Sequence, residues 1–152
     1  MLKFTPVVSN PYENTYEALK LLINNSIYSQ ENKKYYIENK KSYLKEFCTI
    51  KLCTSRQTGH TTAAIKLCNE YFEKSLFLCN TMDMAKRIKK SQYNKNITFG
   101  TITNFHDIYR GMWFDAIIID CACFVGNSKI DAIYDELGPC LNDILKFVIL
   151  IQ

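Results

Sequence analysis

Residues 116–120 read Ala-Ile-Ile-Ile-Asp and residues 147–151 read Phe-Val-Ile-Leu-Ile, and these two runs decide the fold. Both runs are continuously apolar, whereas a strand that faces water on one side alternates between apolar and polar residues. We therefore predict strands that are covered on both faces. Such strands are typical of a parallel sheet between two layers of helices.

Shorter segments around these runs complete an alternating pattern over residues 47–152. We predict further strands at 47–53, 75–79 and 97–102, and helices at 61–72, 82–90, 104–109, 130–137 and 141–145. The predicted fold class is α/β, with a mainly parallel sheet of about five strands and helices on both faces. We expect neighbouring strands of this sheet to carry Cys53, Leu78, Thr101, Ile118 and Ile149.

The first 46 residues follow a different pattern and are interpreted as an N-terminal helical extension (1–46) of one compact domain whose core spans 47–152. A first helix is predicted because apolar residues recur at helical spacing, at Tyr16, Leu19, Leu22, Ile23 and Ile27. A second, lysine-rich helix is predicted at 30–46, where aromatic residues interleave with charges, at Tyr35, Tyr36, Tyr43 and Phe47. This helix is either a solvated face with an aromatic seam toward the core or a phosphate-contacting surface.

Composition excludes several classes of protein. The chain has 152 residues, of which 47% are hydrophobic and 22% charged, so one core of ordinary size is expected and intrinsic disorder is not. The longest purely apolar run, 147–151, is far shorter than the ~20 residues of a membrane-spanning helix, and no signal-peptide pattern begins the chain.

The chain has seven cysteines and no C-x-x-C pair, which predicts reduced thiols and a cytoplasmic location. The spacing of Cys121-Ala-Cys123 fits no usual zinc site.

The turn after the first predicted strand reads Thr54-Ser55-Arg56-Gln57-Thr58-Gly59-His60-Thr61-Thr62. Ligands of open parallel sheets bind beyond the carboxyl ends of the strands, and a phosphate loop there follows G-x-x-x-x-G-K-[ST]. Gly59 and Thr61 fit this pattern, whereas Thr54 replaces the first glycine and His60 the lysine. Asp120 ends another predicted strand, as does the carboxylate that holds Mg²⁺ opposite a phosphate loop. Alone, residues 54–62 also fit an ordinary strand-turn-helix junction, and Asp120 also fits a strand-end cap or turn residue. Together the two motifs favour a P-loop NTPase.

Residues 55–62 resemble the S-R-Q-x-G-K-T-T phosphate loop of large terminase subunits, the DNA-packaging motors of tailed phages. Residues 110–124 are similar to the same family's R-G-x-x-[FA]-x-x-I-x-x-D-E-x-A-F block. The resemblance covers about residues 47–152. It implies ATP and Mg²⁺ as cofactors, with Mg²⁺ held by Thr61 and Asp120 and the chemistry at Asp120, Arg56 and position 121. The implied phosphate-binding residues are Ser55, Arg56, Gln57, Thr58, Gly59, His60, Thr61 and Thr62.

Two departures from the family pattern bear on activity. His60 stands where the family has a lysine, and Cys121 stands where it has the carboxylate that orients the attacking water. An imidazole with an ordinary pKa of about 6.5 is mostly neutral at pH 7, and a thiol is a poor general base for water. Arg56 would supply the fixed cation. We therefore predict ATP·Mg²⁺ binding with weak or no hydrolysis, and we do not expect the family's translocation and nuclease functions.

Two alternatives remain open at this stage. The first is a non-catalytic, degenerate ATPase fold that binds DNA or phage packaging or replication proteins, and the second is an active helicase-like or nucleotide-kinase-like enzyme. Lysine and arginine clusters favour weak, salt-sensitive binding to double-stranded DNA, because each neutralised phosphate releases counterions. These clusters comprise Lys33, Lys34, Lys40 and Lys41, and then Lys86, Arg87, Lys89 and Lys90.

Overall fold

The computed structural model describes residues 10–33, 39–53, 59–92, 94–137 and 147–152 of the chain. Most of the predicted phosphate loop (54–58) lies outside the described residues. The same is true of the predicted helix at 141–145, and of Tyr35 and Tyr36 in the lysine-rich segment.

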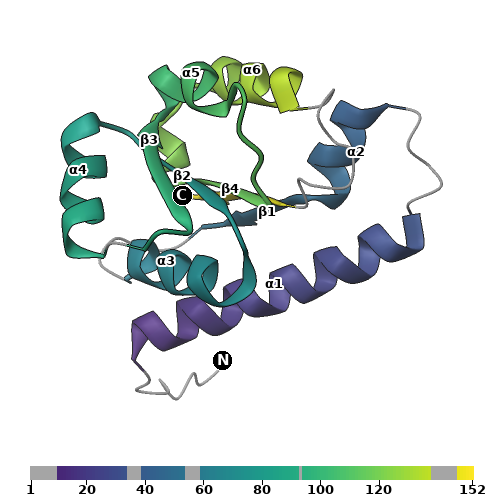
Figure 1. The fold of residues 1–152 in the computed structure, drawn as a ribbon. Helices are drawn as coiled ribbons and strands as arrows, with labels where there is room; N and C mark the ends of the chain where they lie inside the picture. Colours follow the sequence, from purple (N-terminus) through teal and green to yellow (C-terminus); the bar gives the residue numbers. More distant parts are fainter. Residues whose placement is uncertain (1–9, 34–38, 54–58, 93, 138–146) are drawn as a thin grey trace, which may run out of the picture.

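Five strands form one parallel sheet in the order β1-β5-β4-β2-β3 (Figure 1). They are β1 (Thr49–Leu52), β2 (Ser75–Cys79), β3 (Ile97–Thr101), β4 (Ala116–Ile119) and β5 (Phe147–Ile151). The predicted α/β class and parallel sheet are confirmed. The prediction for Cys53 is wrong by one residue, because the pairing of β1 with β5 ends at Leu52 opposite Ile151.

Helices cover both faces of the sheet (Figure 1). One face carries α1 (Pro11–Lys33), α3 (His60–Tyr71) and α4 (Met82–Ser91), and the other carries α2 (Lys40–Phe47), α5 (Phe105–Tyr109) and α6 (Asn127–Leu137). Successive side chains of a strand point to opposite faces. Accordingly, Ile118 of β4 belongs to the same core cluster as Leu19 of α1, whereas Ile117 packs in the cluster of Leu44 and Ile133.

The lysine-rich segment differs from the prediction of one helix over 30–46. Residues 30–33 end α1, and α2 begins at Lys40 because the side chain of Asn39 caps it, accepting a hydrogen bond from the Ser42 N–H at 3.0 Å. Tyr43 is buried and Phe47 partly buried, so the aromatic seam toward the core is confirmed for these two residues. Since α2 includes Phe47, β1 starts at Thr49 rather than at residue 47.

The first predicted helix is confirmed as α1, with its apolar side turned to the core. Leu19 and Ile23 are fully buried, whereas Leu21 is 64% exposed. The helix lies along α3, where the Lys66 ammonium sits 4.1 Å from the centre of the Tyr16 ring and the Tyr16 hydroxyl donates to Glu70. Of the helices in the described ranges, none has the length and apolarity required to cross a membrane.

Candidate functional site

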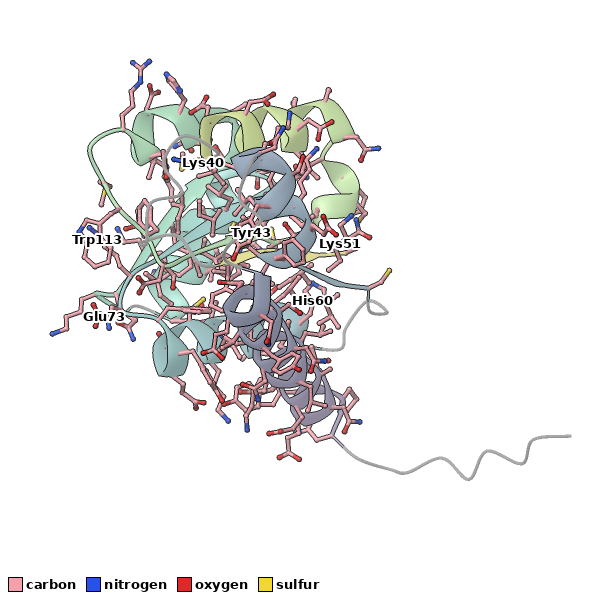
Figure 2. The ribbon with its side chains drawn as sticks, turned by 90° about the vertical axis from the view of Figure 1, so that its right-hand side faces the viewer. Lys40, Tyr43, Lys51, His60, Glu73 and Trp113 are labelled. Carbon is pink, nitrogen blue, oxygen red and sulfur yellow. The ribbon has the colours of Figure 1, made fainter. Side chains whose placement is uncertain are left out.

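Gly59 introduces α3 in a conformation that favours glycine. It is the N-cap, with φ +69° and ψ 23°, and a Cβ atom at this position would lie 3.2 Å from Cβ of Tyr12 on α1. Both the left-handed backbone and the close approach of α1 therefore favour glycine here. The first turn of α3 then contains His60 and Thr61, and Figure 2 places His60 close to α1.

Asp120 is the centre of the site. It follows β4 at the carboxyl edge of the sheet, it is fully buried, and its N–H donates to the Leu78 carbonyl at 2.9 Å. Its Oδ2 accepts a hydrogen bond from the Thr61 hydroxyl at 2.7 Å. Its Oδ1 lies 3.4 Å from His60 Nε2. The structure therefore brings Asp120 together with His60 and Thr61, two adjacent residues from a distant segment, and all three are predicted site residues.

Cys121 adjoins this carboxylate in an uncommon backbone conformation. Its φ of 56° and ψ of 43° are left-handed, a state that costs a side-chain-bearing residue about 1 kcal/mol or more, and its Sγ lies 3.8 Å from Asp120 Oδ1.

Cys79 lies on the neighbouring strand β2. Burial raises the pKa of the Cys79 thiol to about 12, with a further contribution from the charges of Asp120 and Cys121. Cys79 is therefore a neutral thiol at pH 7 and is unsuited to act as a nucleophile.

Thr62, a further predicted site residue within the described part of the chain, does not join this group. Thr62 is exposed in the first turn of α3. Residues 54–58, with Ser55, Arg56, Gln57 and Thr58, lie outside the described part of the chain, so their phosphate-binding roles stay predictions. Tyr12 was not predicted to lie near the site, because no sequence signal connects this residue of α1 with the start of α3.

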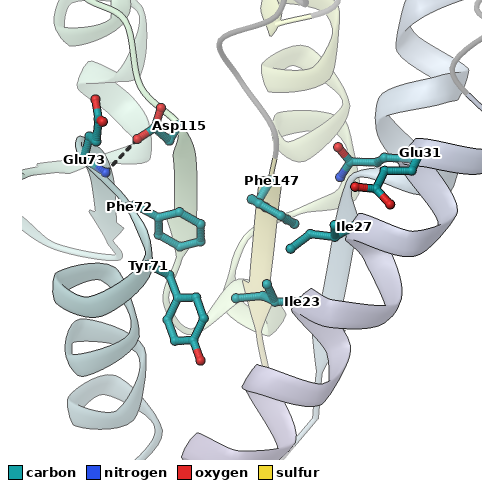
Figure 3. Close-up of a pocket in the computed structure, with 9 residues that line it drawn as sticks. Ile23, Ile27, Glu31, Tyr71, Phe72, Glu73, Asp115 and Phe147 are labelled. Carbon is teal, nitrogen blue, oxygen red and sulfur yellow. Dashed lines mark hydrogen bonds between the residues drawn. The ribbon is translucent and has the colours of Figure 1, made fainter.

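A pocket of about 520 Å³ lies at the opposite edge of the sheet, where the strands begin (Figure 3). In Figure 2, Glu73 of this edge is well separated from His60. Three carboxylates line the pocket and disfavour a phosphate ligand, and they belong to Glu31, Glu73 and Asp115. The apolar wall is formed by Ile23, Ile27, Tyr71, Phe72 and Phe147. Asp115 already accepts hydrogen bonds from the N–H groups of Glu73 and Lys74, at 2.7 and 3.1 Å, so its role is to join β2 and β4.

Comparisons of the chain with family models, with curated proteins and with solved structures found no match. The resemblance to large terminase subunits therefore depends on residues 55–62 and 110–124 themselves.

Proposed function

We propose that the chain is a terminase-like P-loop domain that binds ATP with Mg²⁺ and hydrolyses it weakly or not at all. One observation carries this proposal: the Thr61 hydroxyl lies 2.7 Å from the Asp120 carboxylate at the carboxyl edge of a parallel sheet. A hydroxyl at the start of a helix and a carboxylate at the end of a second strand are the groups by which P-loop proteins hold Mg²⁺.

Each residue would have a distinct role in such a site. The N–H groups at the start of α3 would face the phosphates, and the left-handed Gly59 leaves the approach to them free of a side chain. Thr61 and Asp120 would hold Mg²⁺, which neutralises phosphate charge when it is bound. Cys121 lies where a water-orienting carboxylate is needed, and a thiol does not supply one. Binding without efficient hydrolysis is the consequence.

Calorimetric titration with ATP and with ADP, each with and without Mg²⁺, tests the proposal. We expect weak, Mg²⁺-dependent binding of ATP that Thr61→Ala weakens by about tenfold or more, since a hydrogen bond or ligand to a charged group contributes roughly 1.5–3 kcal/mol. The control is Thr103→Ala, in an exposed threonine of the turn before α5, and it should leave binding unchanged. Absence of ATP binding, or binding that is insensitive to Thr61→Ala, would contradict the proposal.

A second candidate function is a non-catalytic module that binds duplex DNA. Two observations favour it: His60 already occupies the space beside Asp120, and α4 exposes four cationic side chains, Lys86, Arg87, Lys89 and Lys90. The α2 cluster does not extend this surface, because α2 and α4 lie at opposite edges of the sheet (Figure 1). Lys41 of α2 also forms an ion pair with Asp135.

Fluorescence anisotropy with a random duplex at low salt tests this second function. We expect weak binding that decreases steeply with salt, and we expect Lys86→Glu combined with Arg87→Glu to reduce the salt slope by about 2, one for each lost phosphate contact. The matched control reverses the same number of charges on α2, at Lys40 and Lys41. Equal reductions of the salt slope in the α4 and α2 variants would indicate an effect of net charge alone. The absence of DNA binding at high protein concentration would exclude the DNA-binding function.

A further inference from the structure

Three unlike donor groups converge at the carboxyl edge of the sheet. His60 Nε2 lies 3.4 Å and Cys121 Sγ 3.8 Å from the same oxygen, Asp120 Oδ1, and one donor atom of each residue lies within 4.8 Å of the others. Among the histidine, cysteine and acidic side chains that the structure describes, no other group of three or more converges in this way. The two residues that depart from the terminase pattern are thus both in contact with the buried carboxylate.

The spacing of these atoms suits a tetrahedral metal ion. Zinc bonds to nitrogen, oxygen and sulfur of about 2.0–2.3 Å place two ligands of a tetrahedral ion roughly 3.4–3.6 Å apart. The observed distances from Asp120 Oδ1, 3.4 Å to His60 and 3.8 Å to Cys121, are close to these values. The two separations that involve Asp120 therefore suit an ion between the three side chains, and His60 and Cys121 have donor atoms within 4.8 Å of each other.

The surroundings of the carboxylate also fit a metal ligand. Asp120 is fully buried, and the Thr61 hydroxyl donates to Oδ2 at 2.7 Å. This hydrogen bond fixes the plane of the carboxylate while Oδ1 faces His60 and Cys121. Carboxylates that ligate metals are commonly oriented by a hydrogen bond of this kind.

His60 provides a second, independent observation. Its side chain is only 18% exposed, yet Nδ1 is buried and has no hydrogen-bond partner among the residues that the structure describes. Its Nε2 lies 3.4 Å from Asp120, which is long for a hydrogen bond. An ion bound at Nε2 would replace this long contact with a ligand bond, and the ring would keep its proton on Nδ1.

We propose that His60, Asp120 and Cys121 bind a divalent transition-metal ion such as zinc or cobalt, with the fourth position open to water. A nitrogen, an oxygen and a sulfur ligand together favour these ions over Mg²⁺, which prefers oxygen ligands. Three protein ligands and one open position are the arrangement of catalytic zinc sites. This metal site does not depend on nucleotide binding, although both proposals use Asp120.

Titration of the reduced full-length chain with Co²⁺, in the absence of nucleotide, tests the metal site. We expect one ion per chain and a thiolate-to-cobalt charge-transfer band that Zn²⁺ abolishes by displacement and excess Mg²⁺ does not. Cys121→Ser should remove the band, and His60→Asn should weaken binding by about tenfold or more, the scale of changes to a metal's ligand shell. The controls are Cys123→Ser and His106→Asn, which alter an exposed cysteine and an exposed histidine.

A second measurement uses the unmodified chain and so does not depend on how the variants fold. Zn²⁺ should protect Cys121 from alkylation, as read by peptide mass spectrometry, while the exposed Cys53 and Cys123 react. Alkylation of Cys121 that is equal with and without Zn²⁺, or a cobalt band that depends on Cys123 instead, would overturn the metal site. ATP calorimetry on the same preparation separates the two proposals, because either ligand can fail to bind while the other binds.

Discussion

His60→Lys combined with Cys121→Glu is expected to raise ATP hydrolysis at least about 100-fold above that of the unmodified chain, because it restores a compact cation and a general base. His60→Lys alone should mainly tighten ATP·Mg²⁺ binding, since an ammonium beside Asp120 stabilises phosphate charge. Cys121→Glu alone should change only the chemical step. The gain in hydrolysis rate for the paired variant should exceed the sum of the gains for the two single variants, because a positioned charge and a general base act as a unit. Phosphate release over hours is the measurement.

The structure gives a reason for the non-additivity. Cys121 lies next to a fully buried carboxylate, so glutamate alone places a second negative charge beside Asp120 without a permanent cation. The His60 imidazole lies 3.4 Å from Asp120, so a lysine at this position would place its charge near both carboxylates and offset that repulsion. Adding Thr61→Ala to the pair should abolish the gain by removing a Mg²⁺ ligand. Robust hydrolysis by the unmodified chain would contradict the prediction that His60 and Cys121 impair hydrolysis. No ATP binding by the paired variant would contradict the P-loop proposal and favour the non-catalytic module.

The buried strands were the most predictable part of the fold. The bounds of β2 and β5 agree with the predicted ones, because every residue of these strands is buried and the apolar runs are unbroken. The segment at 30–46 was not predictable in the same way. Its lysines and glutamates are compatible with a helix throughout, so the sequence alone did not predict that a new helix starts at Lys40. That start depends on Asn39, whose role as a cap is shown by its hydrogen bond to the Ser42 N–H.

The residues of the candidate site were also predictable from the sequence only in part. Gly59, Thr61 and Asp120 were found from motifs, because a phosphate loop and a strand-end carboxylate have fixed positions relative to strands. The contact of Asp120 with both His60 and Cys121 was not found, because the two departures from the terminase pattern were considered separately. The spacing of Cys121 and Cys123 argued against a metal site within that segment. In the structure Cys121 lies in one group with Asp120 and with His60, which is on another element, and Cys123 is exposed.

Leu19→Ala is expected to lower the free energy of unfolding by roughly 2–5 kcal/mol, the range for removing a buried leucine side chain from a packed core. Leu19 is fully buried and belongs to the same cluster as Ile118 of β4 and Ala64 of α3, so its removal leaves a cavity beside the sheet. Urea unfolding followed by circular dichroism measures the change. The midpoint should shift while the slope of the transition stays constant.

Leu21→Ala is the matched control, because it removes the same atoms from the same helix at a position that is 64% exposed. Its effect should be within about 0.5 kcal/mol. A large difference between the two variants would show that α1 is part of the folding unit that contains the sheet. Small and equal effects would contradict the packing of α1 and make residues 1–46 separable from the core. The result also bears on the site, because Tyr12 of α1 packs against Gly59 at the start of α3.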